Sequence, residues 1–532
     1  MMDVELNSWL LFSHAGVHFA DTEIVSRLVD GRVVRHRYDD FAERAQRLMH
    51  GLDALGLEPG ATIATLAWNS FRHLEAYFGV PCAGRVLHTL NLRLSPDDLA
   101  YIIGHAGDQA ILVDADLLPL LEQIQDRIPS VERFVVLAEE VPETTLPGVI
   151  GYEDLLADQP TRYEQPHIPE RTPLGICYTS GTTGRPKAAV YTHRSTYLHS
   201  VAGCSAAGFA IGPSDCVLPQ VPMFHANAWG MPYASVASGA KIVLYAGALE
   251  AAPFVDLLVD ERVTISGGVP TVWLTVAEEL AARGGRLPDL RHIICGGSQP
   301  PRALIQRYGE EFGIPILQAW GMTETSPLAS VAWPQVRMRE WPADEVMTRA
   351  RTQAGLPLPG IDVAIRDADG TPIAFDGKTP GDLYCRGPWV IDSYLHGDGA
   401  EHFTEDGWFR TGDVAIGSPD GYFVISDRSK DLIKSGGEWI SSVDMEAAIM
   451  AMPAVAEAAV VAIPDPKWQE RPLACVVPKP GVEVSVAAVR DHLEASGFAH
   501  WQLPDRVEII DEVPKTAVGK FDKKVLRARF SA

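Results

Sequence analysis

A turn rich in glycine and hydroxyl residues follows a strand-like run in the stretch Leu174-Gly-Ile-Cys-Tyr-Thr-Ser-Gly-Thr-Thr-Gly-Arg-Pro-Lys187. Backbone N–H groups of such a turn can close around anionic oxygens, and the hydroxyls and the lysine add further donors. It is not a Walker A loop, because Gly-x4-Gly-Lys-Ser/Thr is absent. We therefore predict a loop that binds polyphosphate, against the alternative of a flexible polar loop.

Strand-like and helical segments alternate around this stretch. Strands are predicted at residues 62–68, near 86, and at 110–113, 134–137, 174–177, 241–245, 264–267 and 291–295. One helix is predicted to start at Asp40 as N-cap, with Glu43 completing a capping box, and to end at Gly56. Others are predicted over residues 71–79 and after Ser95 as N-cap. Strands that alternate with helices indicate a doubly wound α/β sheet.

The pattern changes twice towards the C-terminus. After Gln353, glycines and prolines interrupt short strands at residues 363–366 and 381–386, which indicates a distorted antiparallel β-barrel. After Lys430, helices at 443–450 and 486–494 and strands at 457–463, 473–477 and near 507 predict a small α+β unit. We place the boundary at residues 427–431, with an N-terminal domain over 1–429 and a C-terminal domain over 430–532.

Composition excludes several classes of protein. The net charge of −24 disfavours nucleic acid as a partner, because binding phosphates requires an excess of Lys and Arg. The chain contains no run of eighteen apolar residues, which would be needed to predict a transmembrane segment. The N-terminus lacks the features of a signal peptide, so we expect a cytoplasmic protein. The 7 cysteines are scattered singly, which indicates buried apolar residues and neither disulfides nor a zinc site.

Further motifs follow the loop in a fixed order. They are Gln318-Ala-Trp-Gly-Met-Thr-Glu324, Gly407-Trp-Phe-Arg-Thr-Gly-Asp413, Asp427-Arg-Ser-Lys-Asp-Leu-Ile-Lys434 and Pro514-Lys-Thr-Ala-Val-Gly-Lys520. Together with the loop, they span essentially the whole chain and resemble the adenylate-forming superfamily of acyl-CoA synthetases, firefly luciferase and nonribosomal-peptide adenylation domains. The resemblance implies two doubly wound sheets, a distorted β-barrel and a small mobile α+β C-terminal domain.

The resemblance also implies an activity. A carboxylic acid is activated with ATP and Mg²⁺ to an acyl-adenylate, pyrophosphate is released, and the acyl group passes to coenzyme A. Trp320 is expected to stack on adenine, Asp413 and Arg428 to bind the ribose, and Glu324 to hold Mg²⁺ with the help of Thr179. The whole expected ATP-binding set is Thr179, Ser180, Gly181, Thr182, Thr183, Gly184, Lys187, Gly297, Gln318, Ala319, Trp320, Gly321, Thr323, Asp413, Arg428 and Lys520.

Taken singly, several of these residues have an ordinary structural explanation. Trp320 alone would be read as a core aromatic, Glu324 and Asp413 as surface or turn acids, and Arg428 as a surface cation. The order of the motifs favours the functional interpretation. One departure from the family's usual pattern is Ala188, where glycine commonly follows the loop lysine; a methyl group there could alter the packing of the loop.

The C-terminal motifs carry the remaining catalytic expectations. Attack of a carboxylate on the α-phosphate builds charge on anionic oxygens, and the resemblance implies that the Lys520 ammonium stabilises it. Lys430 lies at the family's hinge position, where the small domain rotates between the two half-reactions. Residues of the following loop are expected to serve the reaction with coenzyme A: Lys434, Gly436, Gly437, Glu438 and Trp439.

The acyl pocket is expected around Pro222-Met-Phe-His-Ala-Asn-Ala-Trp229, with His225, Trp229 and Val269 as its residues. Relatives that activate amino acids place an aspartate near here for the substrate ammonium. This chain has His225 and Asn227 instead, which favours an uncharged acyl tail. His225 is also a catalytic candidate, with packing alone as the alternative. The stretch resembles bacterial medium- and long-chain fatty acyl-CoA synthetases most closely, and in that subgroup the tryptophan at Trp229 is proposed to gate the acyl tunnel.

Other interpretations stay open at this stage. The substrate could be 3-methylmercaptopropionate or another short or aryl acid, or the acyl group could pass to a carrier protein, although no carrier domain follows Ala532. A luciferase-like oxygenase would share the fold and the first half-reaction. A nucleotide-binding relative without activity is disfavoured, because Glu324 and Lys520 are both present. Homodimers occur in the family, and the sequence carries no visible signal for the oligomeric state.

Overall fold

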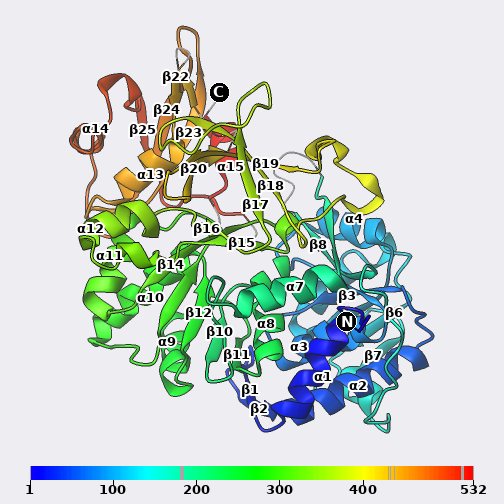
Figure 1. The fold of residues 1–532 in the computed structure, drawn as a ribbon. Helices are drawn as coiled ribbons and strands as arrows, with labels where there is room; N and C mark the ends of the chain where they lie inside the picture. The colour runs from blue at the N-terminus through cyan, green and yellow to red at the C-terminus, as the bar shows by residue number, and fades with distance from the viewer. Residues whose placement is uncertain are drawn as a thin grey trace.

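A large body built on two sheets carries a smaller C-terminal lobe, drawn orange to red in Figure 1. The computed structural model describes residues 2–179, 185–428, 431, 433–435, 438–516 and 521–530, without the side chains of residues 427, 428, 438 and 439. The second body sheet has parallel strands in the middle and antiparallel strands at both edges, whereas the first has an antiparallel strand at its β9 edge and a parallel one at its β7 edge. The doubly wound α/β class is confirmed.

The first body sheet has the order β7-β6-β5-β3-β4-β8-β9, with only the β8–β9 pair antiparallel among its described strands. Its strands are β3 (Thr62–Leu66), β4 (Val86–Thr89), β5 (Asp108–Val113), β6 (Arg133–Val136), β7 (Val149–Gly151), β8 (Pro173–Tyr178) and β9 (Ala188–Thr192). The phosphate loop predicted from the sequence therefore lies between two antiparallel strands. A Walker A loop would instead lead into a helix.

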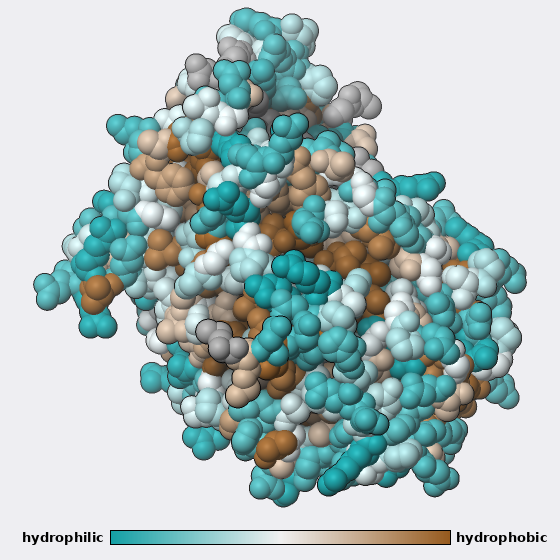
Figure 2. Space-filling view, turned by 45° about the vertical axis from the view of Figure 1, so that its right-hand side comes forward, coloured by the Kyte–Doolittle hydropathy of each residue, from teal (hydrophilic) through white to brown (hydrophobic). Residues whose placement is uncertain are grey.

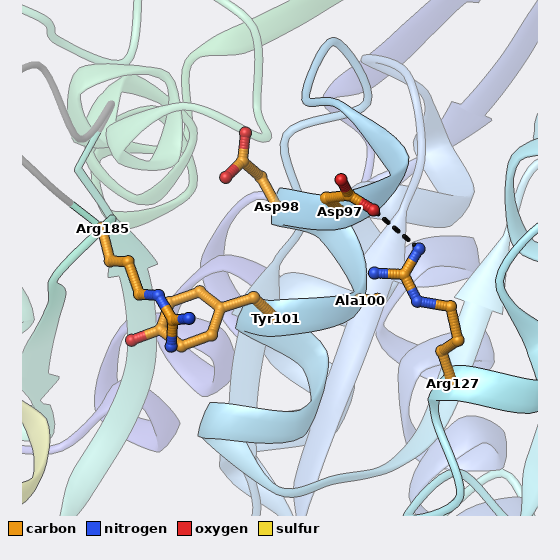
Figure 3. A pocket seen from close by; sticks show the side chains of 6 residues that line it. All are labelled: Asp97, Asp98, Ala100, Tyr101, Arg127 and Arg185. Carbon is orange, nitrogen blue, oxygen red and sulfur yellow. Dashed lines mark ion pairs between the residues drawn. The ribbon is translucent and has the colours of Figure 1, made fainter.

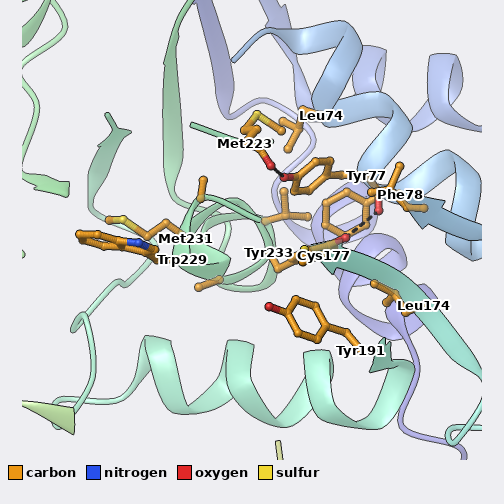
Figure 4. Close-up of a cluster of buried hydrophobic side chains, with 14 of the residues drawn as sticks. Leu74, Tyr77, Phe78, Leu174, Cys177, Tyr191, Met223, Trp229, Met231 and Tyr233 are labelled. Carbon is orange, nitrogen blue, oxygen red and sulfur yellow. Dashed lines mark hydrogen bonds between the residues drawn. The ribbon is translucent and has the colours of Figure 1, made fainter. Parts of the chain in front are cut away.

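The second body sheet has the order β16-β15-β14-β13-β12-β10-β11-β1-β2. Its strands are β1 (Glu23–Arg27), β2 (Val33–Arg37), β10 (Cys216–Pro219), β11 (Lys241–Tyr245), β12 (Ile265–Gly268), β13 (His292–Cys295), β14 (Ile316–Gly321), β15 (Leu328–Val331) and β16 (Leu356–Pro357). Residues of both sheets belong to one apolar core, so the sheets are packed into a single body. Figure 4 shows part of this core close up.

Helices cover the body sheets and the small lobe. In the body they are α1 (Ser8–His18), α2 (Tyr38–Ala54), α3 (Phe71–Cys82), α4 (Pro96–Ala106), α5 (Leu118–Glu122), α6 (Tyr152–Leu156), α7 (His193–Cys204), α8 (Met231–Ser238), α9 (Ala251–Asp260), α10 (Pro270–Arg283), α11 (Arg302–Arg307) and α12 (Ala343–Val346). In the small lobe they are α13 (Ser442–Met450), α14 (Val486–Ala495) and α15 (Lys523–Phe530).

The start of α2 differs from the prediction. Arg37, not Asp40, occupies the N-cap position, and the Asp40 carboxylate accepts a hydrogen bond from the Arg37 backbone N–H at 3.0 Å. Asp40 therefore supplies the acidic half of a capping box one turn further in. Ser95 caps α4 as predicted, because its Oγ accepts from the Asp98 backbone N–H at 3.1 Å.

The predicted distorted barrel corresponds to an antiparallel sheet with the order β17-β18-β19-β20. Its strands are β17 (Asp362–Arg366), β18 (Pro380–Arg386), β19 (Phe409–Gly417) and β20 (Phe423–Arg428). The Ala354 N–H donates to Phe423 O at 2.7 Å, which joins β20 to the chain leading into β16. This sheet thus lies between the second body sheet and the C-terminal lobe in the chain.

The C-terminal lobe is the predicted α+β unit. Its sheet contains β21 (Ile433–Ser435), β22 (Glu438–Ile440), β23 (Val455–Asp465), β24 (Gln469–Pro478) and β25 (Arg506–Ile509). Basic residues near its C-terminus form ion pairs within the lobe: Lys515 with Glu457, Lys523 with Glu446 and Arg527 with Asp431. These three cations therefore have structural partners within the lobe.

Apolar surface gathers across the middle of the molecule in Figure 2, between the upper lobe and the lower body. Within the described residues, no helix has both the length and the apolar character needed to span a membrane. The cysteines are free, and all except Cys204 are buried, as predicted. The apolar surface seen in Figure 2 lies where the body and the lobe approach each other.

Candidate active site

The predicted ATP and acyl residues of the body come from the carboxyl ends of neighbouring strands. Most of the predicted residues stand in, or in the loops directly after, the strands β8, β10, β12, β13 and β14. The two body sheets are tied together there, because the Tyr191 hydroxyl of β9 donates to Thr323 O at 2.7 Å. The Cys177 thiol of β8 likewise donates to Asn227 Oδ1 at 3.1 Å. Ligands of α/β proteins commonly bind at such an edge.

The neck of the predicted phosphate loop is closed by Thr179 and Lys187. The Thr179 N–H donates to Lys187 O at 2.9 Å, and the Lys187 N–H donates to Thr179 Oγ1 at 3.2 Å. The Lys187 ammonium lies 3.1 Å from Glu401 Oε1. Ser180, Gly181, Thr182, Thr183 and Gly184 lie outside the described residues. The buried Ala188 methyl packs in a small apolar cluster with Val86 and Ile176, so the structure accommodates it.

Trp320 and Asp413 meet although they come from different sheets. The indole Nε1 of Trp320 donates to Asp413 Oδ2 at 3.0 Å, and the two residues are 8% and 2% exposed. Gly412, with φ +72°, precedes Asp413 within β19 and gives the strand a turn that other residues rarely adopt. The indole also packs against the Phe423 ring in a T-shaped arrangement, with centroids 5.5 Å apart. The side chain of Arg428, the second expected ribose contact, lies outside the described residues.

The residues next to Trp320 have little freedom. At Gly321 a Cβ would come 1.9 Å from Pro327 O, so only glycine fits this approach of two backbone segments. Gly297 follows β13 with φ +80°. Gln318 and Ala319 are buried in β14, and within the described part of the chain the buried Gln318 Oε1 accepts no hydrogen bond. A buried acceptor without a partner is a candidate for binding a ligand donor.

Glu324 is held by a residue that the sequence analysis missed. The Tyr394 hydroxyl donates to Glu324 Oε1 at 2.5 Å, and both residues are buried. Thr323 lies beside it, with its carbonyl bound by Tyr191. Tyr394 stands in an irregular connection without periodicity, so only its position as a lone aromatic among polar residues could have drawn attention to it.

The described residues could hold Mg²⁺ only together with ligands from the substrate and water. They contain no group of three His, Cys, Asp or Glu side chains that could hold a metal ion by themselves. Mg²⁺ commonly uses one or two carboxylates and takes its other ligands from substrate phosphates and water. The single buried carboxylate of Glu324 matches this arrangement, with Thr179 at the neck of the phosphate loop as the second expected residue.

The acyl segment has an unusual backbone. Ala226, Asn227, Ala228 and Trp229 all have positive φ, between 42° and 59°. Each such non-glycine residue is held in a sparsely populated conformation, and this strain concentrates at functional sites. The indole of Trp229 lies close to Gly296, where an added Cβ would come 3.2 Å from Trp229 Cη2. The partly buried Val269 packs against the same core, and the backbone N–H of His225 donates to Pro222 O at 3.0 Å.

Large side chains fill the space around this segment. Figure 4 shows Trp229 and Met231 on one side, and Tyr77, Met223, Tyr233, Tyr191 and Cys177 packed beyond them. The Tyr77 hydroxyl donates to the Met223 carbonyl, and the rings of Tyr77 and Tyr233 stack with centroids 5.2 Å apart. Asn227 is buried, and its Oδ1 also accepts from Thr89 Oγ1 at 3.4 Å. The segment is thus surrounded by apolar side chains and fixed by uncharged hydrogen bonds.

The residues expected to serve the second half-reaction lie elsewhere. Figure 1 shows β22, with the backbone of Glu438 and Trp439, at the far tip of the small lobe, away from β8 and β14. Lys434 precedes it in β21, and its N–H donates to Glu470 Oε2 at 2.8 Å. Lys430, Gly436, Gly437 and Lys520 lie outside the described residues. The structure therefore does not bring β22 together with Trp320 and Asp413.

A recess of about 530 Å³ opens between α4 and Arg185 (Figure 3). The Arg185 guanidinium lies over the Tyr101 ring, 4.9 Å from its centroid, and Arg127 pairs with Asp97 at 2.8 Å. Asp98 adds a second carboxylate to the lining. Because acids and bases alternate here, the recess has no single charge that would select an anionic ligand.

Comparison with known proteins identifies similar chains. Residues 12–395 match the family described as AMP-binding enzyme, and residues 444–520 match the AMP-binding enzyme C-terminal domain. A long-chain-fatty-acid–CoA ligase of Thermus thermophilus is 47% identical over 534 residues, covering 100% of this chain and 96% of the relative. A 3-methylmercaptopropionyl-CoA ligase of Ruegeria lacuscaerulensis is 42% identical over 522 residues, covering 98% of this chain and 96% of the relative.

A solved structure shares the fold. The crystal structure of an anthranilate CoA ligase in complex with anthranoyl-AMP superimposes with a TM-score of 0.88 at 24% sequence identity. The match covers 99% of this chain and 98% of that chain. The similarity therefore extends over the body and the small lobe alike.

Proposed function

The chain belongs to the family of AMP-binding enzymes, and we infer that it is an AMP-forming acid–CoA ligase. The sequence relatives described above are CoA ligases that match it over nearly their whole length. One structural observation carries the nucleotide half of the proposal: β14 and β19 bring the Nε1 of Trp320 and the Oδ2 of Asp413 within 3.0 Å of each other. An aromatic side chain for a purine and an acceptor for ribose hydroxyls are therefore direct neighbours.

In the first half-reaction we assign the binding of ATP to the body. Trp320 stacks on adenine, Gln318 Oε1 accepts a hydrogen bond from a nucleotide donor, and Asp413 accepts hydrogen bonds from the ribose. Thr179, Lys187 and the loop between them receive the phosphates. The Glu324 carboxylate, together with the Thr179 hydroxyl, would hold Mg²⁺. When bound, the ion would neutralise phosphate charge.

The chemistry balances without any further reactant. A carboxylate oxygen of the acid attacks the α-phosphorus, the bond to the β-phosphate oxygen breaks, and pyrophosphate leaves. Lys520 stabilises the charge that builds on the phosphoryl oxygens. In the second half-reaction the thiol of coenzyme A loses its proton and attacks the acyl carbon, and AMP leaves with the electron pair of the broken acyl–oxygen bond.

For the acid we propose an uncharged tail, most simply a medium- or long-chain fatty acid. The segment from His225 to Trp229 has apolar surroundings, and Asn227 is held by a thiol and a hydroxyl. A substrate ammonium would lack a carboxylate there, and an unpaired buried charge is costly. The relative from Ruegeria makes 3-methylmercaptopropionate the second candidate.

A panel of acids tests the proposal. Purified protein is incubated with ATP, Mg²⁺, coenzyme A and acids from C2 to C18, aromatic acids and methylthio acids, and AMP and free thiol are measured. We expect AMP formation and thiol loss in equal amounts with at least one acid. Acid-dependent pyrophosphate exchange without thiol loss would favour transfer to a carrier protein. No AMP from any acid would contradict the proposal.

We propose that residues 1–429 and 430–532 are separate domains and that rotation at Lys430 brings the Gly436 to Trp439 loop to the active site. Lys430→Pro is expected to preserve acid-dependent pyrophosphate exchange but to abolish thioester formation, because proline fixes φ and resists the change at a hinge. Both rates are measured on one preparation, with Lys430→Ala as the control that keeps the backbone free. Normal thioester formation by Lys430→Pro would rule out a hinge at this residue.

A further inference from the structure

The connection between β18 and β19 is hydrogen-bonded to the loop that carries Glu324. The Trp389 Nε1–H donates to Leu328 O at 2.9 Å, and the Ile391 N–H donates to Glu324 O at 2.9 Å. Tyr394 then forms an isolated antiparallel bridge with Ala189, at the start of β9. This connection therefore fixes the Glu324 loop against the strand that leaves the phosphate loop.

Tyr394 contacts the side chains of both Glu324 and Lys187. Its hydroxyl donates to Glu324 Oε1 at 2.5 Å, and the two residues are 4% and 6% exposed. The Lys187 ammonium lies 5.6 Å from the centroid of its ring.

The backbone nearby leaves room for this arrangement. Gly399 has φ +64°, and a Cβ there would come 2.9 Å from Lys187 Nζ and 3.1 Å from the Tyr394 ring. Glu401, two residues later, pairs with the same ammonium at 3.1 Å. The connection therefore accommodates the lysine, the tyrosine and the carboxylate as one packed unit.

We propose that Tyr394 is a positioning residue that orients the Glu324 carboxylate for Mg²⁺ and supports Lys187 for the phosphates. This inference rests on the proposed function. The hydroxyl occupies one carboxylate oxygen, and within the described residues the other oxygen of Glu324 accepts no side-chain or backbone hydrogen bond. A metal ion that arrives with ATP then meets a carboxylate whose rotation is already fixed. Preorganisation of this kind lowers the cost of binding.

Tyr394→Phe removes the hydroxyl and keeps the ring, so it isolates the bond to Glu324. We expect the Mg²⁺ concentration for half-maximal pyrophosphate exchange and the KM for ATP to rise about tenfold, as for the loss of a hydrogen bond to a charged group. The KM for the acid is expected to stay unchanged. A purely structural role would instead lower the melting temperature and disturb the kinetic constants for all substrates together.

A double-mutant cycle with Glu324→Gln separates the two possibilities sharply. If Tyr394 acts through the carboxylate, Tyr394→Phe adds little further shift to the Mg²⁺ and ATP dependence in the Glu324→Gln background. Full additivity of the two substitutions would overturn the inference. The matched control is Tyr422→Phe, which removes a buried hydroxyl bonded to Trp333 O at 2.6 Å and should shift neither dependence.

The wild-type chain distinguishes failure of the inference from failure of the function. Acid-dependent exchange in the wild type, with an unshifted Mg²⁺ and ATP dependence in Tyr394→Phe, would overturn the role of Tyr394 alone. Absence of exchange with every acid in the wild type would overturn the proposed function and this role with it. Circular dichroism and melting of each variant verify that the compared proteins are folded.

Discussion

Acid-dependent pyrophosphate exchange is expected to fall about a hundredfold or more when Lys520 is replaced by alanine, the scale seen on losing one preorganised donor to a transition state. The α-phosphate gains negative charge as the carboxylate attacks, and a positioned ammonium stabilises that charge more than it stabilises bound ATP. The effect should therefore appear in kcat for exchange. Purified Lys520→Ala is assayed with the best acid of the panel at saturating ATP.

The second half-reaction provides an internal control for this variant. Lys520→Ala supplied with chemically prepared acyl-adenylate and coenzyme A should still form thioester, because no phosphoryl transfer occurs in that step. Lys524→Ala, which removes an exposed lysine of α15, should leave exchange unchanged. An exchange rate in Lys520→Ala equal to that of the wild type would remove Lys520 from the mechanism.

The residues on either side of this motif have contacts within the small lobe. Lys515 and Phe521 form an antiparallel bridge, and the Asp522 N–H donates to Pro514 O at 2.7 Å, so both ends of the motif are anchored in the small lobe. Lys515, Lys523 and Arg527 are held by acids of that lobe. These three cations thus have structural partners, and the ordered motifs assign Lys520 to catalysis.

Local sequence patterns were sufficient to predict most helices and strands. β11 spans Lys241–Tyr245 as predicted, because a short apolar run between polar residues has one natural register. The start of α2 was wrong because Asp40 can fill either end of a capping box, and the sequence does not say which backbone N–H it binds. Tertiary contacts decide such boundaries.

The candidate site was predictable as a list of residues but not as a geometry. The motifs indicated Trp320 and Asp413 separately, and nothing in either motif predicts the bond between them, because it depends on how two sheets pack. The left-handed run from Ala226 to Trp229 contains no glycine that would have signalled it. Tyr394 escaped for a similar reason, since its importance lies in a contact with a residue 70 positions away.

Asp413→Ala is the second substitution with a large expected effect. A buried carboxylate that accepts hydrogen bonds from two ribose hydroxyls contributes about 1.5–3 kcal/mol for each bond, so the KM for ATP should rise about a hundredfold or more. The loss is expected in ATP binding, because the ribose does not change during the reaction. Initial rates of pyrophosphate exchange over a range of ATP concentrations measure it.

The substitution must be separated from damage to Trp320. Alanine leaves the Trp320 Nε1–H without the acceptor it has at 3.0 Å, whereas Asp413→Asn retains an oxygen for that bond and removes only the charge. Analogues of ATP complete the test. Wild-type protein should discriminate against 2′-deoxy-ATP and 3′-deoxy-ATP, and Asp413→Ala should treat them almost like ATP, because the partner of the missing hydroxyls is gone. If Asp413→Ala kept the full discrimination of the wild type, the ribose contact would belong to another residue, and Asp413 would be left with the task of holding the indole.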